Sequence, residues 1–180
     1  VEFASSSASQ ENRWRRLIDQ VRRRFSGWLT YSANWDEIDR VAFWDALDVI
    51  GVNAFQPLAS RPDATLHDFV AGATRFADEI EILAGAYGKP VLLTEFGFRS
   101  MPGSAVRPWE WPEHLAGTPC DFASQATAYE AIFRAFVPRR WFFGLFVWKY
   151  FSNPDDVMQE DPCGGFSPRG KPAETVLGAW

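Results

Sequence analysis

The stretch Lys89-Pro90-Val91-Leu92-Leu93-Thr94-Glu95-Phe96-Gly97-Phe98 decides the fold. Its apolar run over residues 91–93 is typical of a parallel strand that is covered on both faces. The run ends on Glu95, a carboxylate that is costly to bury and therefore rarely serves packing. Gly97 lets the chain turn away directly afterwards. Because the ligands of parallel α/β folds lie at the carboxyl ends of the strands, we expect Glu95 to do chemistry; the structural alternative is an ion pair with an arginine such as Arg99.

Alternating helix and strand patterns continue on both sides of this stretch. Apolar residues spaced by three or four predict helices over residues 10–25, 65–87, 122–137 and 172–180, and a shorter helical segment over 41–47. Thr65 and Asp68 form a cap pair at the start of the longest helix, and Gly88 ends it. Aromatic and β-branched runs predict strands over 28–35, 49–55 and 141–151, and residues 1–3 resemble the end of another strand.

Five strands that are each followed by a helix fit two α/β architectures. One is a five-stranded doubly wound sheet, and the other is the last five units of an eight-unit barrel. A barrel unit takes about 31 residues, so five units need about 156 residues and leave room for two long loops, over 99–121 and 152–171. Because the first strand looks truncated, we expect a partial (β/α)8 barrel made of strands four to eight. Residues 1–180 would then be a single incomplete catalytic domain that lacks strands one to three.

Composition excludes several classes of partner. The formal charge is −5 with no long run of either sign, so we expect no nucleic acid. The arginines between Arg13 and Arg24 are interpreted as the solvated face of a helix. No run approaches the roughly 20 apolar residues that a membrane span needs.

Aromatic residues are frequent and cysteines are rare. The 9 Trp, 16 Phe and 4 Tyr fit either a large core or flat ring faces that stack on sugars. Cys120 and Cys163 are too few for a disulfide framework or a zinc site, and they leave a single bridge or two free thiols open. We therefore expect no metal and no organic cofactor.

Glu2 has the same sequence context as Glu95, at the end of a strand-like segment. If the chain begins at strand four of a barrel, Glu2 ends strand four, Glu95 ends strand seven, and both side chains lie at the active face. Two converging carboxylates suit glycoside hydrolysis, in which one attacks the anomeric carbon and the other transfers protons. Without Glu95, Glu2 would be read as a surface acid.

Five segments occur in the order of a known family over nearly the whole chain. They are Val1-Glu2-Phe3, Leu29-Thr30-Tyr31-Ser32-Ala33-Asn34-Trp35, residues 43–55 (FWDALDVIGVNAF), Pro90-Val91-Leu92-Leu93-Thr94-Glu95-Phe96-Gly97-Phe98 and residues 165–173 (GFSPRGKPA). On these segments the chain resembles glycoside hydrolase family 113, which includes retaining endo-β-1,4-mannanases.

The resemblance implies a role for each candidate residue. Glu95 would be the nucleophile and Glu2 the acid/base. Trp148 would form the aromatic floor under the sugar, although core packing is the alternative because its neighbours Phe146 and Val147 look core-like. Asn34, Trp35 and, more weakly, Asn53 would contact the sugar, with a buried structural role as the alternative for the asparagines.

Two positions depart from the expected family pattern. Phe55 ends a strand where a tyrosine would orient the nucleophile, and Val1 precedes Glu2 where many related enzymes carry asparagine. The first departure puts the catalytic rate in question. The second puts the contact to the sugar 2-hydroxyl in question.

The sequence therefore predicts a retaining glycosidase that acts on a β-linked oligosaccharide or polysaccharide such as mannan. The alternatives are another β-linked specificity, including an amino sugar, and a non-catalytic carbohydrate-binding barrel. We expect the isolated segment to be inactive and unstable because its outer strands would be open edges. A secreted or cell-envelope location in a bacterium is favoured over the cytoplasm, and the sequence does not indicate an oligomeric state.

Overall fold

The structure is a computed structural model that describes residues 10–110, 117, 119–157 and 160–180. Four parallel strands form one sheet in chain order: β1 (Thr30–Asn34), β2 (Val49–Asn53), β3 (Val91–Phe96) and β4 (Phe142–Val147). Each strand therefore pairs with the next strand along the chain, and the sheet grows in one direction only. A doubly wound sheet would reverse this order at a switch point, so the described sheet is singly wound. The expected strand at residues 1–3 lies outside the described residues.

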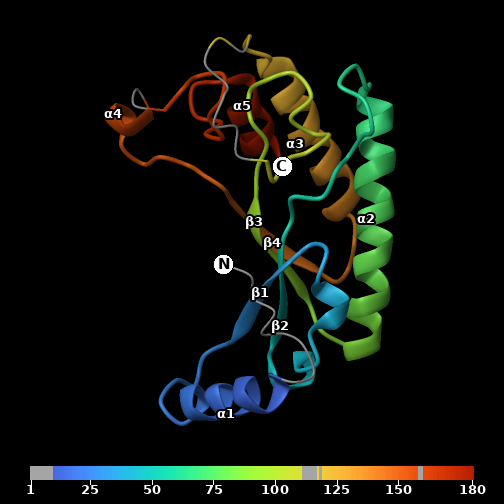
Figure 1. The fold of residues 1–180 in the computed structure, drawn as a ribbon, viewed down its shortest axis with the longest axis vertical. Coiled ribbons are helices and arrows are strands. Elements are labelled where there is room, and N and C mark those ends of the chain that lie inside the picture. The colour runs from blue at the N-terminus through green and yellow to red at the C-terminus, as the bar shows by residue number, and fades with distance from the viewer. Residues whose placement is uncertain (1–9, 111–116, 118, 158–159) are drawn as a thin grey trace.

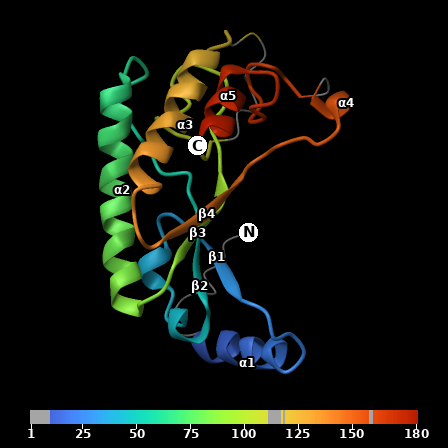
Figure 2. The same cartoon turned by 180° about the vertical axis from the view of Figure 1, so that it is seen from behind.

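Helices precede, connect and follow the strands of this sheet. They are α1 (Glu11–Arg22), α2 (Leu66–Tyr87), α3 (Phe122–Phe136), α4 (Pro154–Val157) and α5 (Pro172–Ala179). Figures 1 and 2 show α2 and α3 running beside the strands and α1 at the far end of β1. The helical segment expected at 41–47 is instead two 3-10 turns, Ile38–Arg40 and Trp44–Ala46, and the turn α4 lies inside the expected loop 152–171.

The longest helix, α2, begins and ends where its sequence predicts. The Thr65 hydroxyl accepts a hydrogen bond from the Asp68 N–H at 3.3 Å, and the Asp68 carboxylate accepts one from the Thr65 N–H at 2.8 Å. This reciprocal pair satisfies two N–H groups that the first turn would otherwise leave without partners. Gly88 ends the helix in the left-handed conformation (φ 62°), which costs a glycine little. The chain then enters β3 directly.

The apolar side chains of α2 and α3 pack on one face of the sheet. Ile50, Val52, Val91 and Leu93 lie under them and are buried. Helix α1 departs from the expectation, because only Ile18 is buried while Leu17, Val21 and Phe25 are exposed. It packs mainly through Trp14, whose ring contacts Tyr31 and Phe43 at one end of the sheet.

The arginines of α1 are also less solvated than expected. Arg15 donates hydrogen bonds to the Asp45 carboxylate at 2.8 and 2.9 Å, and Arg22 pairs with Asp48. The predicted solvated face is therefore partly an ion-paired face that ties α1 to the segment before β2.

The opposite face of the sheet is open in the described structure. Thr30, Ser32 and Asn34 alternate along β1 on this face and are exposed. Phe146 on β4 is 62% exposed, so the expectation that it is a core residue is wrong. Because successive residues of β4 point to opposite faces, Phe146 points to the open face while Leu145 and Val147 pack against the core under the helices.

Two exposed aromatic rings reveal the curvature of the sheet. Trp28 lies just before β1 and Phe143 lies on β4, and these are the two outermost strands, yet the ring centroids of the two residues are 5.1 Å apart. Three strand spacings of a flat sheet amount to about 14 Å. The sheet therefore curls so that its open face is concave.

Candidate active site

The carboxyl ends of the four strands bring together five of the six residues singled out from the sequence. Asn34 pairs with Asn53 in the sheet register, and Asn53 pairs with Glu95. The Trp148 N–H donates to the Phe96 carbonyl at 2.7 Å, which places Trp148 next to Glu95 at the same edge. Trp35 follows Asn34, and its N–H donates to the Asn53 carbonyl at 3.2 Å. Glu2 lies outside the described residues. We call this edge the carboxyl rim.

An irregularity in β3 directs Glu95 to the open face. Val52 pairs with Leu93 while the next residue, Asn53, pairs with Glu95, so β3 contains one extra residue here. Phe96 is fully buried on the helix side, where its ring lies 4.6 Å from that of Tyr129. Because successive strand residues point to opposite faces, Glu95 points away from that core. Such bulges re-aim side chains at functional sites.

The Glu95 carboxylate has no hydrogen bond or ion pair with any residue in the described ranges. Partial burial, with no compensating charge, raises its pKa above the usual 4.5. The alternative pairing with Arg99 does not occur. The Arg99 guanidinium is buried over the Phe166 ring, 4.9 Å from its centroid.

Glu160 illustrates what a structural carboxylate looks like in this protein. It accepts the Phe166 N–H at 3.1 Å and the Ser167 N–H at 3.0 Å, and its carboxylate lies 3.5 Å from the Lys149 ammonium. These bonds fold the segment after β4 back onto the rim. Glu95 lacks every one of these features, so packing or loop anchoring does not account for it.

Asn53 connects the polar side chains of the rim. Its carboxamide oxygen accepts hydrogen bonds from the hydroxyls of Ser32 at 2.7 Å and Thr94 at 3.0 Å. Its NH₂ group donates to the Asn34 oxygen over a long 3.5 Å. The carboxamide oxygen is thus occupied, whereas the NH₂ group retains a second hydrogen. Ser32 and Thr94 were missed from the sequence, although the alternation of Thr30, Ser32 and Asn34 along β1 could have indicated a polar face.

Trp148 contacts the backbone just after the end of β3. It is 37% exposed, and its peptide bond to Lys149 is cis. A Cβ on Gly97 would collide with the Trp148 carbonyl oxygen, so this approach requires glycine. Gly97, proposed from the sequence as a turn residue, also keeps Trp148 close to Glu95.

Trp35 contacts a residue that the sequence did not single out. Its ring centroid is 5.5 Å from that of Trp109, which belongs to the long segment after β3. Phe55, at the position where a tyrosine was expected, packs edge-on against Phe166 at 6.2 Å. The concentration of tryptophan in residues 99–121 was the available signal for Trp109, but the signal did not identify a partner.

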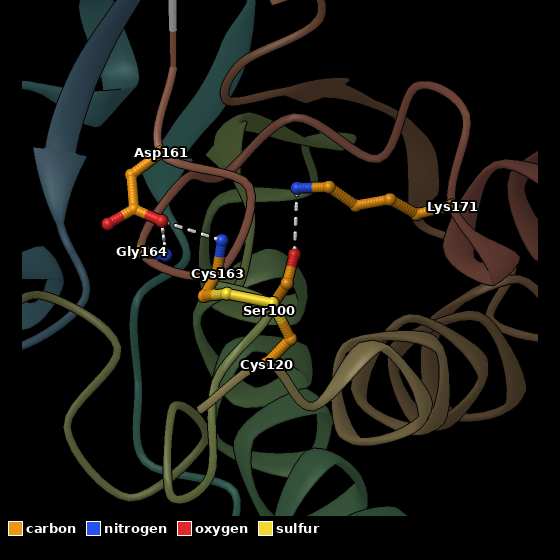
Figure 3. Close-up of a disulfide and its surroundings, with 6 residues drawn as sticks. All are labelled: Ser100, Cys120, Asp161, Cys163, Gly164 and Lys171. Carbon is orange, nitrogen blue, oxygen red and sulfur yellow. Dashed lines mark hydrogen bonds between the residues drawn. A yellow bond between two sulfur atoms is a disulfide. The ribbon is translucent and has the colours of Figure 1, made fainter. Parts of the chain in front are cut away.

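A disulfide joins the two long segments that leave the rim. Cys120 and Cys163 are bonded, with their Cα atoms 4.4 Å apart, which settles the alternative that the sequence left open. Figure 3 shows the bridge beside Ser100, whose hydroxyl accepts a hydrogen bond from the Lys171 ammonium at 2.8 Å. Asp161 accepts the N–H groups of Cys163 and Gly164 at 2.8 and 3.1 Å. The segments after β3 and β4 are therefore held together next to the site.

The described part of the chain contains neither a metal-binding cluster nor a membrane-spanning helix. Within residues 10–110, 117, 119–157 and 160–180, no three His, Cys, Asp or Glu side chains gather in a way that could hold a metal ion. No helix in these ranges combines the length and the apolar character that crossing a membrane requires.

Comparison with known proteins identifies the family. Residues 2–171 match the model of glycoside hydrolase family 113. A solved GH113 β-1,4-mannanase superposes with a TM-score of 0.78 at 29% identity, covering 97% of this chain and 51% of that one. The GH113 β-mannanase AaManA from Alicyclobacillus acidocaldarius, in complex with ManMIm, gives 0.74 at 29% identity over 95% and 51%.

More distant structures share the fold alone. The β-glucuronidase of Ruminococcus gnavus superposes with a TM-score of 0.65 at 16% identity, over 97% of this chain and 30% of that one. Comparison with curated protein sequences returns no match. The chain spans about half the length of the mannanases that it resembles, 51%. On the match over residues 2–171, the chain belongs to glycoside hydrolase family 113.

Proposed function

We propose that this protein is a retaining glycoside hydrolase of β-linked glycans, with β-1,4-mannan as the substrate. The observation that carries the proposal is the state of Glu95, an unpaired, half-buried carboxylate on the concave side of a parallel rim. Family membership and the two mannanase structures support the choice of mannan. The Glu95 carboxylate lies where a sugar could reach it.

The described sheet is, in this proposal, strands five to eight of a (β/α)8 barrel, and residues 1–3 end strand four. The curl that brings Trp28 to Phe143 and the 51% coverage of the relatives support this assignment. Residues 1–180 alone would then be an incomplete catalytic domain. The exposed aromatic rings of the concave face would make that isolated chain unstable and inactive.

In the first chemical step, a Glu95 carboxylate oxygen forms a bond to the anomeric carbon as the bond from that carbon to the leaving oxygen breaks. Glu2 donates its proton to the leaving oxygen. The product is a glycosyl ester on Glu95 and a Glu2 carboxylate. In the second step, Glu2 takes a proton from water, the water oxygen attacks the anomeric carbon, and Glu95 leaves as a carboxylate.

The other rim residues bind the sugar in this proposal. Trp148 offers an exposed ring face as a floor beneath the ring at Glu95. Asn34 and Trp35 contact the substrate at the end of β1. Asn53 holds Asn34 through its NH₂ group and offers that group's second hydrogen to a sugar hydroxyl.

The disulfide provides evidence on the cellular compartment in which the protein works. Structural disulfides persist in oxidising surroundings, and the Cys120–Cys163 bridge supports a location outside the cytoplasm. We therefore propose that the enzyme works on extracellular or envelope-accessible polysaccharide.

The test measures hydrolysis of an activated aryl β-mannoside and of a panel of β-linked polysaccharides by the full natural polypeptide that carries this sequence. Wild-type protein should turn over mannan, and Glu95→Ala should abolish turnover while leaving binding to mannan intact. Glu79→Gln, an exposed acid of α2, is the charge control and should behave as wild type. Binding of glycans by the wild type without any turnover would contradict the proposal and indicate a carbohydrate-binding barrel.

A further inference from the structure

Glu160 is a mostly buried carboxylate in the segment that follows β4. Its side chain is only 12% exposed. It accepts hydrogen bonds from two consecutive backbone groups, the N–H of Phe166 at 3.1 Å and the N–H of Ser167 at 3.0 Å. Hydrogen bonds to an ionised carboxylate are roughly twice as strong as bonds between neutral groups. Because burying a carboxylate is costly, a neutral side chain would serve simple packing better at this position.

The backbone that follows Glu160 is shaped to receive its carboxylate. The Asp161 side chain accepts the N–H groups of Cys163 and Gly164, as Figure 3 shows, and the Asp161 carbonyl accepts the Gly165 N–H at 2.7 Å. These bonds form a tight turn that brings the chain back to Glu160. A Cβ on Gly165 would collide with the Glu160 carboxyl group, so the carboxylate lies directly on the backbone of the turn.

The same carboxylate also contacts the residue that follows Trp148. A Glu160 oxygen lies 3.5 Å from the Lys149 ammonium, which in turn lies 4.5 Å from the centroid of the Phe151 ring. Strand β4 ends at Val147, so Lys149 lies beyond the sheet. Glu160 therefore connects the turn that it holds to the chain directly after Trp148.

The backbone group that Glu160 holds is itself fixed to the core. The carboxamide of Gln125 on α3 donates hydrogen bonds to the Phe166 carbonyl at 3.1 Å and to the Phe98 carbonyl at 2.8 Å. Gln125 and Phe98 are fully buried. Phe166 is therefore tied to α3 and to the chain just after β3. Glu160 links this fixed point to Lys149.

Trp148 is anchored by β3 only through its backbone. Its N–H donates to the Phe96 carbonyl at 2.7 Å, and its carbonyl oxygen approaches Gly97 closely. The Trp148 ring remains 37% exposed, so packing around the ring does not by itself fix its direction. The conformation of the chain after Trp148 matters for that direction, and the contact between Glu160 and Lys149 acts at this point.

We propose that Glu160 is a positioning residue for the reaction, which holds the Trp148 ring in place beside Glu95. This inference rests on the proposed function, in which Trp148 is the floor beneath the sugar. Glu160 does not contact the sugar and exchanges no proton with it. It acts through Lys149 on one side and through the backbone of Phe166 on the other.

The first part of the experiment is a double-mutant cycle on the kcat/KM of the full natural polypeptide with β-1,4-mannan. Glu160→Ala should lower kcat/KM by roughly tenfold, because a displaced substrate-binding group costs catalysis even when the chemical groups are intact. In a Trp148→Ala background, Glu160→Ala should cause no further loss, since the ring that it positions is absent. A residue that only stabilises the fold would cause the same loss in both backgrounds.

The second part observes Trp148 directly and needs no turnover. The protein is labelled with fluorotryptophan, and the fluorine NMR signal of Trp148 is identified by its disappearance in Trp148→Phe. Glu160→Ala should shift this signal. Lys149→Met removes the ion pair but leaves the backbone bonds of Glu160 intact, so it should cause a smaller shift and a smaller loss of kcat/KM. It also keeps the test decisive if Glu160→Ala does not fold.

Glu130 provides a matched control, because it is another carboxylate that holds a tryptophan. It accepts the indole N–H of Trp180 at 2.9 Å and pairs with Arg134 at 2.6 Å, away from the rim. Glu130→Ala should shift the fluorine signal of Trp180. It should leave the signal of Trp148 and the kcat/KM unchanged.

Each outcome of the experiment has a distinct meaning. A loss of kcat/KM that disappears in the Trp148→Ala background, together with a shifted Trp148 signal, supports the positioning role. An equal loss in both backgrounds, or an unshifted Trp148 signal, overturns that role while leaving the proposed hydrolase intact. If the wild type hydrolyses no β-linked glycan, the proposed function fails and the positioning role in catalysis fails with it.

Discussion

The two ends of the sheet each carry exposed tryptophans and a carboxylate, but the carboxylates are in opposite states. At the amino end, Asp48 accepts the Leu29 N–H at 2.7 Å and pairs with Arg22, and these contacts hold its pKa below the usual 3.8. At the carboxyl rim, Glu95 has no such partner in the described structure, and burial raises its pKa. Exposed aromatic rings therefore do not distinguish the two ends. The acid without a partner in the described structure does, and the proposed function places the chemistry there.

Replacing the two acids should separate catalysis from stability. Glu95→Gln should lower kcat/KM on mannan by about 10⁴-fold or more, because it removes the group that is proposed to form the covalent intermediate. Asp48→Asn should lower the melting temperature with little change in the kcat/KM of the folded protein. Steady-state kinetics and thermal unfolding of both variants check this. A large loss of kcat/KM in folded Asp48→Asn would erase the distinction between the two ends.

Removing the disulfide should destabilise the carboxyl rim. The bridge spans a sequence separation of 43 residues. The loop-entropy model then gives about 4 kcal/mol for its contribution to the free energy of unfolding. Denaturant unfolding of Cys120→Ser/Cys163→Ser against wild type measures the difference. An unchanged unfolding midpoint in the double variant would mean that the long segments are held by their hydrogen bonds alone.

Two tryptophans offer a direct comparison between the ends of the sheet. Trp148→Ala should reduce kcat/KM by roughly 10- to 100-fold, because the ring is proposed to stack on the sugar at Glu95 and burial of an aromatic face contributes about 1.5–3 kcal/mol. Trp28→Ala, at the amino end, should leave kcat/KM unchanged and affect only stability. Kinetics of the two variants, normalised to folded protein, provide the measurement. Equal losses in both would contradict the assignment of substrate binding to the carboxyl rim.

The smallest expected effect is on the pH dependence of stability, which should have opposite signs for Glu95 and Asp48. The Glu95 pKa is higher in the folded protein than in the unfolded chain, so between these values the folded state holds more protons and wild-type stability declines as pH rises. Glu95→Gln should accordingly be more stable than wild type at pH 7 and equal to it below pH 4.5, the ordinary value.

Asp48 should show the opposite trend. Its folded pKa is depressed, so its contribution is present above pH 3.8 and is lost as pH falls through the folded value. Asp48→Asn should thus be less stable than wild type at pH 7, and the difference should shrink towards pH 3. Melting temperatures of wild type and both variants across this range check the two predictions. If both substitutions change the melting temperature in the same direction at pH 7, the environments of the two acids are not opposed.

Local patterns were sufficient for much of the fold. The buried run over 89–98, the Thr65–Asp68 cap with Gly88, and the alternation of helices and strands all depend on neighbours along the chain, and β3 and α2 confirm them. The family followed from the same segments and is confirmed by the match over residues 2–171. The roles of Glu95, Glu2, Trp148, Trp35, Asn34 and Asn53 remain predictions.

Features that depend on distant segments could not be predicted. The extra residue that turns Glu95 to the open face is visible only once β2 and β3 are paired. The partner of Trp109 and the pairing of Cys120 with Cys163 depend on how the long segments fold over the rim. Phe146 looked like a core residue because it stands in an apolar run, and only the pairing of Leu145 with the buried Leu93 shows that Phe146 lies on the open face.

The most direct test of the account is to trap the covalent intermediate. The full natural polypeptide is incubated with an activated 2-deoxy-2-fluoro-β-mannoside, which forms the glycosyl ester and slows its hydrolysis, and the labelled peptide is identified by mass spectrometry. One sugar adduct, on Glu95, is expected. A protein that hydrolyses mannan but carries its adduct on another carboxylate, such as Glu160 or Asp36, would contradict it.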